Sequence, residues 1–175
     1  MRDPEAQGLV RTEIFEHSDW IELDRGAISI EQAIARGASR TGLPREDIER
    51  IFREVPRFLT PMQETIDLIH SLRKTNCRLF VLSNMHLASI TYLEQKHKIW
   101  DLFDGTVISC RIQMVKPEIE IYKHLVATWE LEATETVFID DMDENLAAAA
   151  SIGIHPIKFV NASQCRRHLS RFLNV

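Results

Sequence analysis

Polar side chains that suit phosphate and metal chemistry follow three short apolar runs in the second half of the chain. Ser83 and Asn84 come after the first run, Lys116 after the second, and Asp140 and Asp141 after the third. A hydroxyl and an ammonium group can hold phosphate oxygens, and carboxylate oxygens are ligands that Mg²⁺ prefers. The order of these residues predicts a site for a phosphoryl group with Mg²⁺.

Each of these residues, taken alone, also has a purely structural interpretation. Serine is common in the turn after a strand, and a lysine before a proline usually lies on the solvated surface. Asn145 could face solvent, and one of the two aspartates could cap a helix. However, adjacent carboxylates after a buried strand repel each other unless a cation lies between them. The whole set at successive strand ends therefore favours the functional interpretation.

The elements that must position these residues alternate between strands and helices. The apolar runs predict strands at residues 78–82, 105–109, 136–139 and 157–160. Helices are predicted at residues 61–72, 86–98, 117–129 and 144–151, the first with Thr60 as its N-cap. Such alternation predicts an α/β fold, a Rossmann-like parallel sheet with helices on both faces. In such sheets ligands gather at the carboxyl ends of the strands, where the polar residues lie.

The first third of the chain has a different pattern, with helical spacing and no strand. A first helix is expected around residues 9–20. Ser29 and Gln32 form a capping-box pattern for a helix that ends at Gly42, and Pro44 begins another. We therefore expect a small helical module at residues 1–58, followed by the α/β core at residues 59–175.

Composition excludes several classes of protein. The chain has 175 residues, 45% of them hydrophobic, so it can bury a core. Its formal net charge of −5 and lack of a dense basic run argue against nucleic acid as a partner. No apolar run is long enough to span a bilayer, so we expect no membrane association. Three cysteines without metal-ligand spacing are typical of reduced thiols, which predicts a cytoplasmic protein.

These residues resemble the motifs of the haloacid dehalogenase-like (HAD) hydrolase superfamily over nearly the whole chain. Leu82-Ser83-Asn84 resembles its second motif and Lys116-Pro117-Glu118 its third. The fourth motif is matched by the segment 137–141, continuing through Asn145 and Gly153. Receiver domains use similar groups, but there the acid pair comes first in the chain and the lysine last, so they are disfavoured. The helical module is similar to the small cap of bacterial sugar-phosphate phosphatases and of the N-terminal phosphatase domain of soluble epoxide hydrolases.

The resemblance implies an Mg²⁺-dependent phosphatase of a small phosphorylated metabolite. It implies that Ser83 binds a phosphoryl oxygen, that Asn84 supports this contact, and that Lys116 neutralises the charge of the nucleophile and the phosphoryl group.

The resemblance also assigns the acid pair and the helix that follows it. It implies that Asp141 ligates Mg²⁺ and that Asp140 either ligates the ion through water or orients Lys116. Asn145 would contact these groups rather than the ion or the substrate.

The first motif of this superfamily, a strand ending in Asp-x-Asp that supplies the nucleophile and the acid, has no counterpart here. Asp3 lies near the start of the chain but follows no strand. In the superfamily this strand lies between the one ending at Ser83 and the one ending at Asp140. Those two strands could pair directly, accept a strand from another chain, for example in a homodimer, or receive a segment of the natural product that this sequence lacks.

Two functions remain open at this point. The first is a HAD-like hydrolase whose chain is inactive as given because the nucleophile is absent. The alternative is a non-catalytic relative that binds phosphate or acts as an interaction module.

Overall fold

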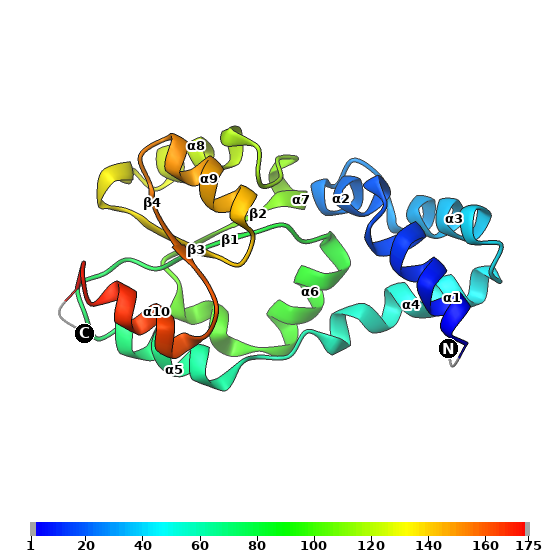
Figure 1. Cartoon of the computed structure of the whole chain (residues 1–175), viewed down its shortest axis with the longest axis horizontal. Coiled ribbons are helices and arrows are strands. Elements are labelled where there is room, and N and C mark those ends of the chain that lie inside the picture. Colours follow the sequence, from blue (N-terminus) through cyan, green and yellow to red (C-terminus); the bar gives the residue numbers. More distant parts are fainter. Residues whose placement is uncertain (1–2, 174–175) are drawn as a thin grey trace. The chain divides into compact units, whose positions relative to one another are not determined.

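The computed structural model describes residues 3–173, which fall into two compact units whose elements are labelled in Figure 1. Within the described part, unit 1 comprises residues 3–60, 84–97 and 108–115, and unit 2 comprises residues 61–83, 98–107 and 116–173. In this same part of the chain, no helix combines the length and apolar character needed to cross a membrane.

Unit 1 is built from helices, and local sequence signals explain where several of them begin and end. They are α1 (Pro4–Val10), the π-helical η1 (Arg11–Phe15), α2 (Ser18–Arg25), α3 (Ile30–Thr41), α4 (Arg45–Phe58), α6 (Leu87–Lys96) and α7 (Ser109–Ile112). The predicted capping box at Ser29 is confirmed: its hydroxyl accepts from the Gln32 amide at 3.2 Å, and its own amide donates to the Gln32 side chain at 2.8 Å. The predicted end at Gly42 is also confirmed, because this residue adopts a left-handed conformation with φ of 67°.

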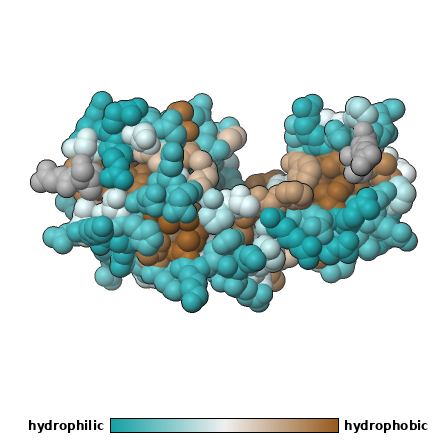
Figure 2. All heavy atoms as spheres, turned by 90° about the horizontal axis from the view of Figure 1, so that it is seen from below, coloured by the Kyte–Doolittle hydropathy of each residue, from teal (hydrophilic) through white to brown (hydrophobic). Residues whose placement is uncertain are grey.

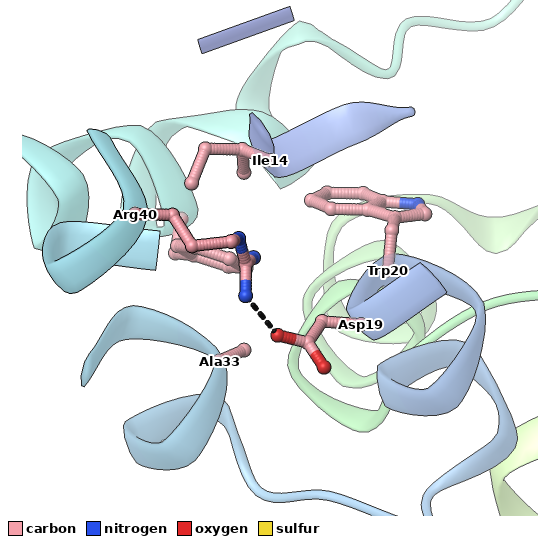
Figure 3. A pocket seen from close by; sticks show the side chains of 6 residues that line it. Ile14, Asp19, Trp20, Ala33 and Arg40 are labelled. Carbon is pink, nitrogen blue, oxygen red and sulfur yellow. Dashed lines mark hydrogen bonds and ion pairs between the residues drawn. The ribbon is translucent and has the colours of Figure 1, made fainter. Parts of the chain in front are cut away.

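Asp19 is a buried carboxylate that lies among apolar side chains in unit 1. Ile14, Ile48 and Phe52 are almost completely buried there. Asp19 accepts hydrogen bonds from Arg36 at 2.9 Å and from Arg40 at 2.6 Å, and Figure 3 shows the second of these. Burial pushes the pKa of Asp19 upward, but the two guanidinium groups outweigh it and hold the pKa below its ordinary value. The pair is a packed structural element, since the space beside it is too small to hold a water molecule.

Unit 2 contains strands with helices on two sides. Its strands are β1 (Phe80–Ser83), β2 (Gly105–Ile108, whose last residue belongs to unit 1), β3 (Val137–Asp140) and β4 (His155–Lys158). Its helices are α5 (Gln63–Leu72), η2 (Lys98–Leu102), α8 (Ile119–Thr128), η3 (Ala133–Glu135), α9 (Asp143–Ser151) and α10 (Ala162–Leu169). Helices α8 and α9 lie on one side of the strands, and α5 and α10 lie on the other (Figure 1). This layering confirms the predicted α/β fold class.

The sheet itself differs from the prediction of one continuous sheet. Strand β1 pairs with β2, and β3 pairs with β4 in parallel, from Val137 opposite His155 to Asp140 opposite Lys158. Among residues 3–173, no strand pairing joins β1 to β3. The first of the three outcomes considered above, direct pairing of these strands, is therefore wrong for this structure.

Several predicted element boundaries differ from those observed. The expected first helix is divided into α1, η1 and α2. Helix α5 has Met62 rather than Thr60 at its N-cap and begins at Gln63, because the chain is still extended at Met62. Strand β4 begins two residues before the predicted start, since its ladder follows the length of β3 and an edge strand tolerates Pro156.

The face seen in Figure 2 is mostly hydrophilic but has some apolar areas. Phe58, the last residue of α4, is 79% exposed, and Met62, which follows that helix, is 58% exposed. Val160, after β4, is 67% exposed. The apolar run 157–160 predicted the position of β4 wrongly because only its first two residues belong to the strand. Val160 lies beyond the end of the strand and is exposed.

Candidate active site

An ion pair lies at the point where β3 ends in unit 2. The Lys116 ammonium nitrogen, Nζ, lies 2.6 Å from Oδ2 of Asp140. The two side chains are only 12% and 5% exposed, respectively. The same Nζ lies 5.5 Å from the centre of the Phe138 ring on β3. The ammonium group is thus held in place by a carboxylate and an aromatic face.

The other oxygen of Asp140 is held by the start of α9. Its Oδ1 accepts from the backbone amide of Met142 at 2.8 Å and from the side-chain amide of Asn145 at 2.9 Å. Asn145 is itself buried, and its backbone carbonyl accepts from the Tyr122 hydroxyl at 3.0 Å. Both oxygens of Asp140 are therefore engaged, and the carboxylate has a fixed orientation.

This environment sets the ionisation of the site. Burial raises the pKa of Asp140, but hydrogen bonds from Lys116, Asn145 and the Met142 amide outweigh burial and lower it below the ordinary value. Burial and the nearby Asp140 charge raise the pKa of Tyr122 well above its usual range. At neutral pH the site therefore holds an ionised Asp140 and a neutral Tyr122.

The remaining predicted residues lie at strand ends or in the other unit. Ser83 is half-buried at the end of β1 in unit 2, whereas Asn84 belongs to unit 1. Asp141 directly follows β3 and is exposed to solvent, in contrast to its neighbour Asp140. The structure thus joins Lys116, Asp140 and Asn145 by hydrogen bonds.

The acid pair provides one accessible carboxylate for a metal ion. Over residues 3–173, no three His, Cys, Asp or Glu side chains gather closely enough to form a complete metal site. Mg²⁺ in proteins keeps several waters and is often held by one or two carboxylates together with substrate phosphates. The exposed Asp141 fits this mode of binding, in which phosphate and water complete the coordination.

Comparison with known proteins identifies the family. The family described as haloacid dehalogenase-like hydrolase matches residues 30–159, which is most of the chain. The chain belongs to this family. It is 30% identical to the sesquiterpene phosphatase astK of Aspergillus oryzae over 141 residues, which are 81% of this chain and 72% of that protein.

Solved structures of other HAD proteins have the same fold. A HAD-like family hydrolase from Porphyromonas gingivalis superposes with a TM-score of 0.74 at 25% identity, covering 98% of this chain and 90% of that one. A HAD family enzyme from Bacteroides thetaiotaomicron, in complex with magnesium and inorganic phosphate, has a TM-score of 0.68 at 21% identity. That alignment covers 90% of this chain and 86% of the other.

Asp3, the aspartate nearest the start of the sequence, caps a helix. It is the N-cap of α1 in unit 1, and its side chain accepts from the Glu5 amide at 3.2 Å. It precedes a helix and follows no strand in the described part of the chain, as the sequence predicted.

The sequence analysis gave no role to a buried polar cluster in unit 1. The Asp24 carboxylate accepts from the backbone amide of His86, and the Ser109 hydroxyl donates to the backbone carbonyl of Asp24. Ser109 also accepts from the Met85 amide at 2.9 Å, so helix α2 is tied to the segments that follow β1 and β2. Gly26, two residues after Asp24, is the feature of the sequence that could have indicated this cluster. A Cβ at Gly26 would lie 2.8 Å from the Cys110 carbonyl oxygen, which shows how closely these segments pack.

Proposed function

We propose that this chain carries the phosphate-binding and Mg²⁺-binding groups of a HAD phosphatase that acts on a small phosphorylated metabolite. The observation that carries the proposal is the fixed, nearly buried Lys116–Asp140 pair beside the exposed carboxylate of Asp141. Membership of a hydrolase family and similarity to a named phosphatase support it.

In this proposal the phosphoryl group is held by donors from the end of β1 and from the segment that precedes α8. The Lys116 ammonium group neutralises phosphoryl charge while Asp140 fixes its position. The Ser83 hydroxyl donates to a phosphoryl oxygen, and Asn84 supports that contact. The fixed orientation of these donors is what makes them effective, because little reorganisation is needed when charge develops.

Asp141 would hold Mg²⁺ in this site, and Asp140 serves mainly to orient Lys116. The ion, when bound, supplies positive charge to the phosphoryl oxygens. The hydrogen bonds support this division, since both Asp140 oxygens are already engaged whereas Asp141 faces solvent. The three free thiols support the proposal of a reducing, cytoplasmic location.

Turnover requires a group that these residues do not provide. Phosphoryl transfer in the manner implied by the resemblance needs a carboxylate that attacks phosphorus, and Asp3 is used as a helix cap. We therefore expect this chain alone to bind phosphate without hydrolysing its esters. The same observation favours the second candidate function, a non-catalytic phosphate-binding module.

Calorimetric titration with inorganic phosphate, with and without Mg²⁺, tests the binding groups. We expect Mg²⁺ to strengthen phosphate binding, and Asp141→Asn to weaken the Mg²⁺-dependent part by about tenfold or more. Asp143→Asn is the matched control, because it makes the same charge change two residues later on an exposed side chain. Equal effects of the two substitutions, or no phosphate binding by the unmodified chain, would contradict the proposal.

Hydrolysis of p-nitrophenyl phosphate distinguishes the two candidate functions. Activity that depends on both Mg²⁺ and Asp141 would show a complete enzyme and contradict the expected lack of turnover. An isoprenyl monophosphate is the first specific substrate to test, because the Aspergillus oryzae relative is a sesquiterpene phosphatase. Asp141→Ala protein, prepared in parallel, reveals any contaminating phosphatase.

A further inference from the structure

The segment 84–86, between β1 and α6, is held by two buried side chains of unit 1. The backbone amide of Met85 donates to the Ser109 hydroxyl at 2.9 Å, and the backbone amide of His86 donates to the Asp24 carboxylate. Asp24 is 8% exposed and Ser109 is 0% exposed. Two consecutive amides are therefore bound by side chains from distant positions in the sequence.

These two contacts restrict the backbone around Asn84. A peptide unit is planar, so the Met85 amide lies in one plane with the carbonyl group of Asn84. Holding that amide restricts the dihedral angle ψ of Asn84, and holding the His86 amide restricts the next peptide plane. The contacts thus set the direction in which the chain leaves the end of β1.

Regular secondary structure does not supply these contacts. Strand β1 ends before the segment, and His86 is the N-cap of α6. The first amides of a helix and the amides just before it have no partner within the helix. Buried amides need an acceptor, and here the side chains of Asp24 and Ser109 provide it.

Asp24 is joined to the segment through its backbone as well as its side chain. The Ser109 hydroxyl, which accepts from Met85, donates to the backbone carbonyl oxygen of Asp24. Helix α2 is thus connected to the segment by two routes, one through Ser109 and one through the Asp24 carboxylate. A displacement of α2 would break both routes together.

The other buried aspartate of α2 contacts a different part of unit 1. Asp19 is also 8% exposed, but it is paired with Arg36 and Arg40 of α3. What position 24 needs for its contact with the His86 amide is an acceptor oxygen. Aspartate and asparagine both present such an oxygen at the same distance from the backbone, whereas alanine presents none.

We propose that Asp24 and Ser109 are positioning residues of the phosphate site. They hold the segment 84–86 in the conformation in which Asn84 supports the contact between Ser83 and a phosphoryl oxygen. This inference rests on the proposed function, which assigns that contact, and it adds two residues that act only through the backbone they hold.

Calorimetric titration with inorganic phosphate and Mg²⁺ compares the unmodified chain with Asp24→Ala, Asp24→Asn and Ser109→Ala. We expect both alanine substitutions to weaken phosphate binding by about tenfold or more, as is typical when a group that orients a ligand-binding residue is removed. Asp24→Asn keeps the acceptor oxygen and should restore most of the binding lost in Asp24→Ala. Asp19→Ala is the matched control, because it removes an equally buried carboxylate of the same helix that is paired with α3. It should lower stability without weakening phosphate binding.

Backbone hydrogen exchange of the same variants, without phosphate, shows whether the segment is released. Exchange at Met85 and His86 should accelerate by about tenfold or more in both alanine variants, relative to exchange at Leu93 on α6. Urea denaturation gives the stability of each variant, and binding is measured at a temperature at which the variants are folded. Ser109→Ala removes a single hydroxyl and carries the test if Asp24→Ala does not fold.

The possible results separate this inference from the proposed function. Unchanged phosphate binding in the alanine variants, equal weakening by Asp19→Ala, or unchanged exchange at Met85 and His86 would overturn the inference alone. Binding by Asp24→Asn as weak as that by Asp24→Ala would also overturn it, because the acceptor oxygen would then not be the group that matters. If the unmodified chain binds no phosphate, the proposed function fails and the inference fails with it.

Discussion

Lys116 and Asp140 form a nearly buried ion pair in unit 2, with Nζ 2.6 Å from Oδ2, and Asn145 holds the other oxygen of the carboxylate at 2.9 Å. This contact gives the two adjacent aspartates different environments. Asp140 is committed to contacts within the protein, and Asp141 is left facing solvent. The pair is therefore both a structural element and the part of the candidate site that the chain fixes most firmly.

Lys116→Met should destabilise the chain, because it leaves the Asp140 charge buried with only amide donors. We expect a loss of about 3 kcal/mol in the free energy of unfolding, measured by urea denaturation at pH 7. Asp140→Asn should lower the free energy of unfolding by a similar amount, because it removes the carboxylate that pairs with the Lys116 ammonium group.

The double variant Lys116→Met with Asp140→Asn should lose less than the sum of the two single losses. The pKa of Asp140 is lowered in the folded state. Its contribution to the free energy of unfolding is therefore present above a pH of about 4 and is lost as the pH falls below that value, through the lowered pKa of the folded state. Lys116→Met should reduce this acid-dependent loss. Strict additivity of the two substitutions, or an unchanged acid profile, would show that the pair is not coupled in solution.

Tyr122→Phe tests the support behind Asn145. Removing the hydroxyl leaves the buried Asn145 carbonyl without the donor now 3.0 Å away, and we expect a loss of about 1–2 kcal/mol. Tyr92→Phe, at a half-buried position on α6, is the matched control and should change stability by less than about 0.5 kcal/mol. Urea denaturation of both variants gives the comparison. Equal losses would mean that the hydroxyl of Tyr122 has no special role.

Gly105 allows the indole ring of Trp129 to lie against β2. A Cβ at this position would stand 2.0 Å from the ring, so Gly105→Ala must displace a large side chain that packs on Phe80. We expect a loss of about 1–3 kcal/mol in thermal or urea unfolding. Gly8→Ala is the control, since nothing lies within 4 Å of its Cβ position in α1 and a small gain in stability is expected. An unperturbed Gly105→Ala variant would contradict this packing.

The order of elements could be predicted because it depends on local patterns. Short apolar runs located β1, β2 and β3 to within two residues, and Ser29 with Gln32 located the start of α3. The rule that ligands gather at the carboxyl ends of strands drew attention to Lys116, Asp140 and Asn145. Hydrogen bonds join these three residues, whereas their roles in binding phosphate and metal stay predictions.

Other features depend on contacts between distant segments and could not be predicted from local patterns. The break between β1 and β3 results from the arrangement of strands in space, as does the half-buried state of all of β1. Tertiary contacts also determine that Asp140, and not Asp141, pairs with Lys116. The burial of Asp24 in unit 1 arises from its contact with the segment after β1, which no neighbouring residue in the sequence indicates.

Asp24 and His86 should give opposite pH dependence to the stability of unit 1. Burial raises the pKa of Asp24 to about 7, although a hydrogen bond from the His86 backbone amide opposes this, and burial lowers the pKa of His86 to about 4. The contribution of Asp24 is therefore fully present below about pH 4 and is lost as pH rises to about 7. The contribution of His86 is present above about pH 6.5 and is lost as pH falls toward 4.

These two slopes largely cancel between pH 4 and 6.5 in the unmodified chain, and single substitutions should reveal them. With Asp24→Asn, which keeps an acceptor for the His86 amide, stability relative to the unmodified chain should rise with pH, by at most about 1.4 kcal/mol per pH unit. With His86→Asn, which keeps a good N-cap for α6, relative stability should fall as pH rises. The half-buried Cys110 thiol, whose raised pKa lies above this range, should not contribute. Urea unfolding at half-unit pH steps measures all three profiles, and parallel curves would mean that neither group is buried as the structure shows.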